Sequence, residues 1–188
     1  MSNVEQWRLE LSLRGKNGIA FLSAGAVIWT VITVLHFLPL SLFQQNTGVL
    51  FTTGIMFPLS LVFSALYQAD WKLEGHPLAA LGLYLNLAQL MYFPLLFWAF
   101  SEAPEQVVLF LAVITSAHFY PYGWFYNSRA YYVMAPAGAV GVMLVYAASG
   151  GADWTIPAVM VVLLMVLLLW NRQLYQRRRK SVSRETTG

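Results

Sequence analysis

All eleven lysine and arginine residues of this chain fall on alternate connections between six apolar segments. The segments are close to the length that a helix needs to cross a bilayer, roughly 20 residues for about 30 Å of hydrocarbon. Basic residues are retained on the cytoplasmic side of membrane proteins. The alternation therefore predicts six transmembrane helices with both termini in the cytoplasm. The segments are Gly18–Leu40, Gly48–Leu66, Leu78–Phe100, Gln106–Tyr122, Tyr131–Ala148 and Ile156–Asn171.

The connections alternate without exception between basic and base-free. Three of them carry no lysine or arginine: Ser41–Thr47, Ser101–Glu105 and Ser149–Thr155. The remaining connections and the two tails hold every basic residue: Arg8, Arg14, Lys16, Lys72, Arg129, Arg172, Arg177, Arg178, Arg179, Lys180 and Arg184. The run from Arg177 to Lys180 has two interpretations, a topological anchor or a site for anionic lipid headgroups.

Composition supports an all-α, polytopic integral membrane protein. The chain is 59% apolar and 10% charged, whereas soluble domains are about 25% charged. We expect an interfacial segment at residues 1–17, a six-helix domain at 18–174 and a basic cytoplasmic tail at 175–188. The net charge of +3 lies mostly in the tails, so we expect no nucleic-acid partner. The absence of cysteine excludes disulfides and thiolate metal sites.

The segment before the first apolar stretch has an amphipathic pattern. Val4, Trp7 and Leu11 share one face of a helix, and Glu10 and Arg14 have the spacing of an i,i+4 ion pair. This pattern predicts a short helix in the cytoplasmic interface. The alternative is a frayed tail, because so short a helix is marginal on its own.

Polar residues inside apolar helices are the best candidates for a functional site, because a bilayer penalises them when they lack partners. Asn86 and Gln89 lie on one face of the third span, and Thr115 and His118 lie at comparable depth in the fourth. Two interpretations stay open. These groups either line a ligand pocket in the cytoplasmic half of the bundle or form interhelical hydrogen bonds that fix packing.

The stretch from Phe119 to Tyr132 is the densest local signal, because eight of its fourteen residues are aromatic. Tyr122, Tyr126 and Arg129 would lie at the cytoplasmic mouth of the bundle. They form either an interfacial aromatic belt with a snorkelling arginine or a rim that contacts a polar or anionic ligand.

Several motifs together resemble a known family. They are Phe57-Pro-Leu-Ser-Leu-Val-Phe-Ser64, Pro77-Leu, Asn86-Leu-Ala-Gln-Leu-Met-Tyr-Phe-Pro-Leu-Leu96 and His118-Phe-Tyr-Pro-Tyr-Gly-Trp-Phe-Tyr126. Most of the chain is similar to a family of uncharacterised small six-helix bacterial inner-membrane proteins, a domain of unknown function. The resemblance implies the bacterial cytoplasmic membrane but no activity, and it adds Tyr92 to the candidate ligand-binding residues.

Two classes of function follow. One is a small-molecule binding or transport protein; in size and topology the chain also resembles the substrate-binding subunits of vitamin uptake systems. The other is a structural or regulatory protein that acts through helix and lipid contacts, with a lipid-active enzyme third. We expect no catalytic residue, metal or cofactor, because no carboxylate lies within the bundle and the three histidines lie on different elements. Membrane lipids, a small-molecule ligand, and a second copy or membrane partner subunit are the expected partners.

Overall fold

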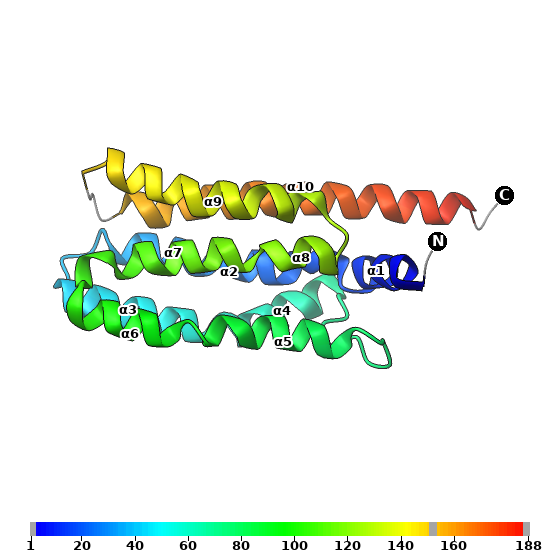
Figure 1. The fold of residues 1–188 in the computed structure, drawn as a ribbon, viewed down its shortest axis with the longest axis horizontal. Helices are drawn as coiled ribbons and strands as arrows, with labels where there is room; N and C mark the ends of the chain where they lie inside the picture. The colour runs from blue at the N-terminus through cyan, green and yellow to red at the C-terminus, as the bar shows by residue number, and fades with distance from the viewer. Residues whose placement is uncertain (1–2, 151–153, 186–188) are drawn as a thin grey trace.

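The computed structural model describes residues 3–150 and 154–185, and every regular element in that part of the chain is a helix. Figure 1 shows an elongated bundle in which successive spans run in opposite directions and the N- and C-terminal ends lie at the same end. Five of the helical stretches are long and apolar enough to cross a membrane, or six if one bent pair is counted as a single span. The predicted all-α class is confirmed.

The elements follow the predicted order. They are α1 (Asn3–Arg14), η1 (Lys16–Gly18), α2 (Ile19–Leu35), α3 (Leu42–Gly54), α4 (Met56–Tyr67), α5 (Ala79–Leu90), α6 (Phe93–Glu102), η2 (Pro104–Gln106), α7 (Val107–His118), α8 (Tyr120–Phe125), α9 (Arg129–Ala148) and α10 (Thr155–Glu185). The second, third and fourth apolar segments are each divided into two helices.

Prolines account for these three breaks. A proline lacks an N–H and its ring clashes with the carbonyl four residues earlier, so a helix tends to end there. Pro58 lies four residues after Gly54, where α3 ends, and Pro94 lies four residues after Leu90, where α5 ends. Pro121 has the same relation to the last turn of α7. The bend between α3 and α4 is 42°.

The second span begins earlier than the sequence suggested. The connection expected at residues 41–47 is helical from Leu42 onward, because Ser41 caps α3. The Ser41 hydroxyl accepts a hydrogen bond from the Gln44 N–H at 3.4 Å, and the Gln44 side chain accepts one from the Ser41 N–H at 3.0 Å. This reciprocal pair satisfies two backbone donors at the helix start.

The core lies between α2, α10, α7 and α9, while the α5–α6 pair is peripheral. α2 packs against α10 and α4, and α7 packs against α9. Within its most apolar window, the first span is 61% buried and the α5–α6 span only 11%. No residue of α5 is fully buried.

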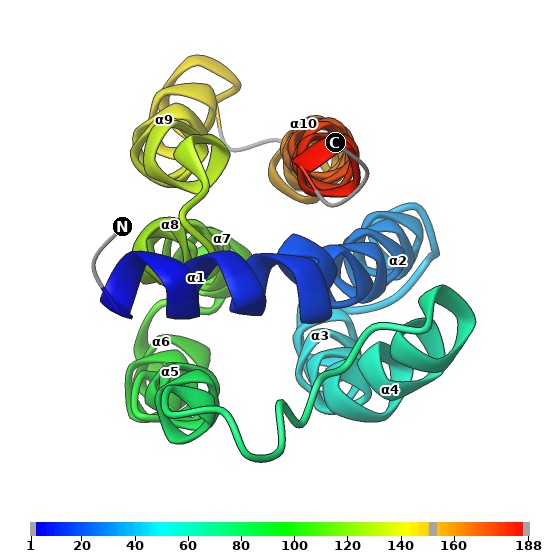
Figure 2. The same cartoon turned by 90° about the vertical axis from the view of Figure 1, so that its right-hand side faces the viewer.

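One end of the bundle holds α1 and most of the basic residues, and we call it the basic end. Figure 2 shows α1 lying across this end, from the side of α8 toward α2. α1 therefore crosses the bundle axis instead of continuing it. The helix follows the predicted amphipathic segment, and Leu11 on its apolar face is completely buried.

Candidate functional site

All but one of the predicted site residues lie along two neighbouring candidate spans, Ala79–Glu102 and Pro104–Phe125, or directly after them. Asn86 and Gln89 lie on α5, Thr115 and His118 on α7, and Tyr122 on α8. The other three stand at breaks or helix ends: Tyr92 between α5 and α6, Tyr126 after α8, and Arg129 at the start of α9. Tyr92 and Arg129 are exposed, whereas Tyr126 is buried.

A close contact between Gly82 and Phe125 sets the relation between these spans. A Cβ added to Gly82 would lie 2.9 Å from Cζ of Phe125, so the α5 backbone packs directly against this ring. The two spans run antiparallel (Figure 1). Counting seven residues away from the basic end, from Gly82 on one span and from Phe125 on the other, corresponds to two helical turns. In a regular helix these turns return to the same face about 10 Å further along the axis. Gln89 and His118 occupy these two positions. A continuous helical register through the break at Phe119, between α7 and α8, would place them at one depth.

Buried apolar side chains flank this position along the chain. Phe125 lies toward the basic end and is 1% exposed. Seven residues further in the other direction along the chain lie Leu96, beyond the break between α5 and α6, and Leu111 on α7. Both are buried. We call the polar position between them the Gln89–His118 layer. It consists of an amide and an imidazole between apolar side chains.

The side chains of the candidate site are almost free of hydrogen bonds within the protein. Asn86 Nδ2 donates to the carbonyl of Gly82 in its own helix at 2.9 Å. Within the described part of the chain, the other seven predicted residues make no side-chain hydrogen bond. The buried serines of α4 behave differently: Ser60 donates to the Phe57 carbonyl and Ser64 to the Ser60 carbonyl. The predicted site therefore shows no interhelical hydrogen-bond network.

Aromatic contacts do join three of the predicted residues. The His118 ring meets Tyr122 edge-on, with ring centroids 5.3 Å apart. Tyr122 stacks on Tyr126 at 6.0 Å, and Tyr126 stacks on Tyr131 at 6.2 Å. Such arrangements contribute about 0.5–1.5 kcal/mol per pair beyond burial. The rings of this aromatic cluster fill the region between the Gln89–His118 layer and the basic end.

The aromatic cluster is covered by the turn that follows α1. The Tyr131 hydroxyl donates to the Asn17 carbonyl at 2.8 Å. A Cβ on Gly18 would lie 2.9 Å from that hydroxyl oxygen, and Gly18 has a φ of +71°. Both the close approach and the left-handed conformation require glycine at this position.

A buried polar network at the basic end was not predicted from the sequence. The Ser12 hydroxyl donates to the Asn17 side chain at 2.7 Å, and Asn17 donates to the Asn171 carbonyl at 3.2 Å. The Ser128 hydroxyl donates to the Asn171 side chain at 2.6 Å. These contacts connect α1, η1, the N-cap of α9 and α10.

Two arginines hold α1 and α10 to the end of α8. Arg178 donates to the Ser12 hydroxyl at 2.7 Å, to the Tyr126 carbonyl at 2.8 Å and to the Asn127 carbonyl. Arg8 donates to the Trp124 carbonyl at 2.6 Å and to the Asn127 side chain at 3.0 Å. Carbonyls at a helix C-terminus carry partial negative charge, which a guanidinium complements. The signal in the sequence was the seven-residue spacing of Asn171 and Arg178, which puts both on one face of α10.

The connection between α4 and α5 is also tied to α1. Arg14 donates to the Asp70 carboxylate at 2.5 and 3.0 Å, and the Asp70 N–H donates to the Arg14 carbonyl. Burial of Asp70 would raise its pKa, but hydrogen bonds from the Leu73 N–H and from Arg14 outweigh burial and lower it. His76 is buried nearby, and its Nε2 has no hydrogen-bond partner; the Glu10 carboxylate lies 3.7 Å away.

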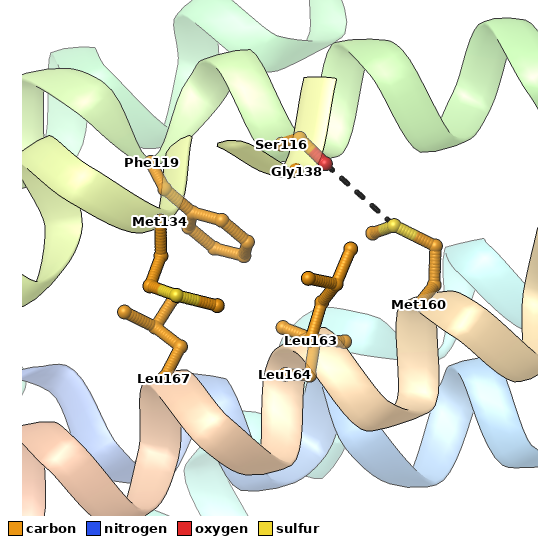
Figure 3. A pocket seen from close by; sticks show the side chains of 8 residues that line it. All are labelled: Ser116, Phe119, Met134, Gly138, Met160, Leu163, Leu164 and Leu167. Atoms are coloured by element: carbon orange, nitrogen blue, oxygen red, sulfur yellow. Dashed lines mark hydrogen bonds between the residues drawn. The ribbon is translucent and has the colours of Figure 1, made fainter. Parts of the chain in front are cut away.

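A small cavity lies elsewhere in the bundle, between α7, α9 and α10 (Figure 3). Its volume of about 10 Å³ is at the lower limit for one water molecule. Ser116 supplies its polar group, and the hydroxyl donates to the Met160 sulfur at 3.6 Å. Because Ser116 and His118 are two residues apart in a helix, they point in nearly opposite directions. Ser116 lies at nearly the same depth as His118, but it is therefore not part of the Gln89–His118 layer.

Among the described residues, no group of three or more His, Asp or Glu side chains is arranged to hold a metal ion. The chemistry available at the Gln89–His118 layer is that of neutral hydrogen-bond donors and acceptors. These groups are suited to binding an uncharged ligand through hydrogen bonds.

Comparison with known proteins gives one match. No curated protein and no solved structure matches the chain. The model of DUF7010, a family of unknown function, matches residues 4–173. This match confirms the resemblance to a domain of unknown function. The chain belongs to the DUF7010 family.

Proposed function

We propose that this protein is a multi-pass membrane protein that binds a small molecule at the Gln89–His118 layer, in the cytoplasmic half of the bundle. The observation that carries the proposal is the absence of hydrogen-bond partners for these two side chains in the described structure. The candidate spans on which they lie are predominantly apolar. A ligand that supplies the missing hydrogen bonds would offset the free-energy cost of placing both side chains in the membrane.

The energetic argument follows from the solvent. A polar group that loses water without gaining a hydrogen bond costs about 1–3 kcal/mol by protein mutational data, and more in pure hydrocarbon. Two threonines of α2 avoid this cost, because Thr30 and Thr33 both donate to carbonyls of their own helix. Gln89 and His118 have no such partner in the protein. We therefore assign them to contact with a ligand.

The orientation follows from charge. The basic residues gather at the end that holds α1, and retention of basic residues on the cytoplasmic side would place that end in the cytoplasm. We accordingly propose the bacterial inner membrane as the location, with both termini cytoplasmic. On this orientation, the Gln89–His118 layer lies about 10 Å inside the Gly82–Phe125 contact at 1.5 Å per residue.

The test is recovery of a bound molecule. The protein is purified in mild detergent, extracted with organic solvent and analysed by mass spectrometry, alongside the double variant Gln89→Met, His118→Phe. Both substitutions keep the approximate volume but remove hydrogen bonding. Ala117→Leu is the matched control, because Ala117 is exposed beside His118 on another helix face.

We expect at least one small molecule to co-purify with the parent chain and with the Ala117→Leu control, and to be depleted at least fivefold from the double variant. Thermal unfolding establishes that each variant is folded. Equal recovery of every extracted molecule from all three folded proteins would refute the proposed site.

A second candidate function rests on the basic end. There, α1 contacts the C-terminal carbonyls of α8 through Arg8 and the extended α10 through the Ser12–Arg178 bond. Such a junction suits a protein that acts through helix contacts with a membrane partner. If this function is the correct one, Arg178→Ala changes co-purification of a partner protein while the double variant at the layer does not.

A further inference from the structure

The Gln89–His118 layer has a chemical character that selects its ligand. Neither residue carries a fixed charge, and α4, α5, α7 and α8 contain no Asp, Glu, Lys or Arg. An amide offers both donors and an acceptor, and a neutral imidazole offers one of each. A charged group brought to this depth would lose its hydration without meeting an opposite charge. The layer therefore favours an uncharged head that donates and accepts hydrogen bonds.

Protein side chains fill the path that a ligand would take from the basic end to the Gln89–His118 layer. Phe125 and Tyr126 are both buried there, and Tyr122 and Tyr131 each stack on Tyr126. α1 lies across this end (Figure 2). A water-soluble ligand entering along the bundle axis would have to displace the aromatic cluster and the turn after α1.

The side of the bundle next to α5 is more open. α5 has no fully buried residue, and it makes no extended contact with α4. Figure 2 shows the α5–α6 pair and the α3–α4 pair as separate columns on either side of the chain that joins them. Large apolar side chains on both are exposed: Leu66 on α4 and Leu83 on α5 are more than half exposed, as is Met91 after α5. In a bilayer these side chains meet lipid tails.

We infer that the ligand is an amphiphile dissolved in the membrane, with an apolar chain and an uncharged hydrogen-bonding head such as a hydroxyl or an amide. It reaches the layer sideways, from the cytoplasmic leaflet. The head bonds to Gln89 and His118, and the apolar chain lies against the exposed surface of α5. This inference rests on the proposed function, because it names the ligand class of the same site.

The test uses three photoreactive probes that differ in one property each. The first is a sixteen-carbon alcohol with a diazirine near its hydroxyl. The second has the same chain and diazirine but ends in a phosphate, and the third is a four-carbon, water-soluble alcohol with the same diazirine. The full chain is reconstituted in phosphatidylcholine vesicles, irradiated with each probe, and mapped by mass spectrometry of peptides from α5 and α7.

We expect the long-chain alcohol to label these peptides at least fivefold more than the phosphate or the short alcohol does. Labelling should fall at least fivefold in the double variant Gln89→Met, His118→Phe and persist in Ala117→Leu. Each single variant is measured too, as a safeguard against loss of fold in the double variant, and a folded single variant should show an intermediate loss.

The outcomes separate this inference from the proposed function. Preferential labelling by the short alcohol or by the phosphate, still dependent on Gln89 and His118, overturns the ligand class and leaves the site standing. Labelling by the long alcohol that is equal in the double variant and the parent chain overturns the inference. If a molecule is nevertheless depleted from that variant in the extraction experiment, the proposed function survives this second result.

Discussion

Replacing Arg178 by alanine should loosen the basic end by a predictable amount. Arg178 is half-buried, and its guanidinium donates to the buried Ser12 hydroxyl at 2.7 Å and to the Tyr126 carbonyl at 2.8 Å. Its third bond, to the Asn127 carbonyl, is at the exposed edge. Hydrogen bonds from charged groups contribute about 1.5–3 kcal/mol each. Taking the two inner bonds at the lower limit gives a loss of about 3 kcal/mol on removal of the side chain.

The assay is thermal unfolding of the purified protein in detergent, followed by intrinsic fluorescence. For a chain of this size, about 3 kcal/mol corresponds to a fall in Tm of about 6–12 °C. Arg179→Ala is the matched control, because Arg179 is exposed and has no side-chain hydrogen bond in the described structure. We expect Arg179→Ala to shift the Tm by no more than about 1–2 °C, in line with ordinary surface substitutions.

Arg178→Lys separates charge from geometry. A lysine keeps the positive charge but lacks the planar fork that reaches several acceptors at once. We expect it to recover less than half of the loss. If Arg178→Ala and Arg179→Ala unfold at the same temperature, the basic-end network does not stabilise the fold in the way described.

Two further predictions concern other contacts. Asp70→Asn removes the ion pair with Arg14; both side chains are 38% exposed, so the loss should be only about 0.2–1 kcal/mol. The pKa of Asp70 is lowered in the folded protein, so its contribution is present above the ordinary value near 3.8 and is lost as the pH falls through the folded pKa. Unfolding midpoints measured from pH 7 down to 3 should therefore converge for the parent chain and Asp70→Asn at the acid end, and parallel curves would contradict this. Gly138→Ala places a Cβ 2.8 Å from the Ser116 hydroxyl oxygen and should cost about 1–3 kcal/mol. Adding Ser116→Gly should make the double variant lose less than the sum of the two single losses, and strict additivity in denaturation would show that the two residues do not touch.

The all-α class and the order of the apolar helical stretches were predictable from the sequence, because length and apolarity act locally along the chain. The breaks were harder. Pro58 and Pro94 divide their spans, yet Pro136 lies inside the continuous helix α9. Proline alone therefore does not decide whether a span is divided, since neighbouring helices can compensate for the lost hydrogen bond.

The placement of the candidate residues along the helices was predictable in part. The three-residue spacing of Asn86 and Gln89 places them on one helix face, and depth alone brings His118 to the same level. The claim that Gln89 and His118 face one another depends on the Gly82–Phe125 contact, which joins residues 43 positions apart and follows from how the helices pack. The hydrogen bonds of the basic-end network join residues that are even further apart in the sequence: Asn17 and Asn171 are separated by 154 positions. No local pattern pairs them.

The central claim is that Gln89 and His118 face one another across α5 and α7, and cysteine cross-linking in membranes tests it most directly. The chain has no cysteine of its own, so introduced pairs react without background. Ser128→Cys with Asn171→Cys is the positive control, because these side chains touch at 2.6 Å. With a short bifunctional thiol reagent, we predict a cross-link between positions 89 and 118 and little or none between 89 and 117. Equal cross-linking of both pairs, or a cross-link through position 117 alone, would contradict the account.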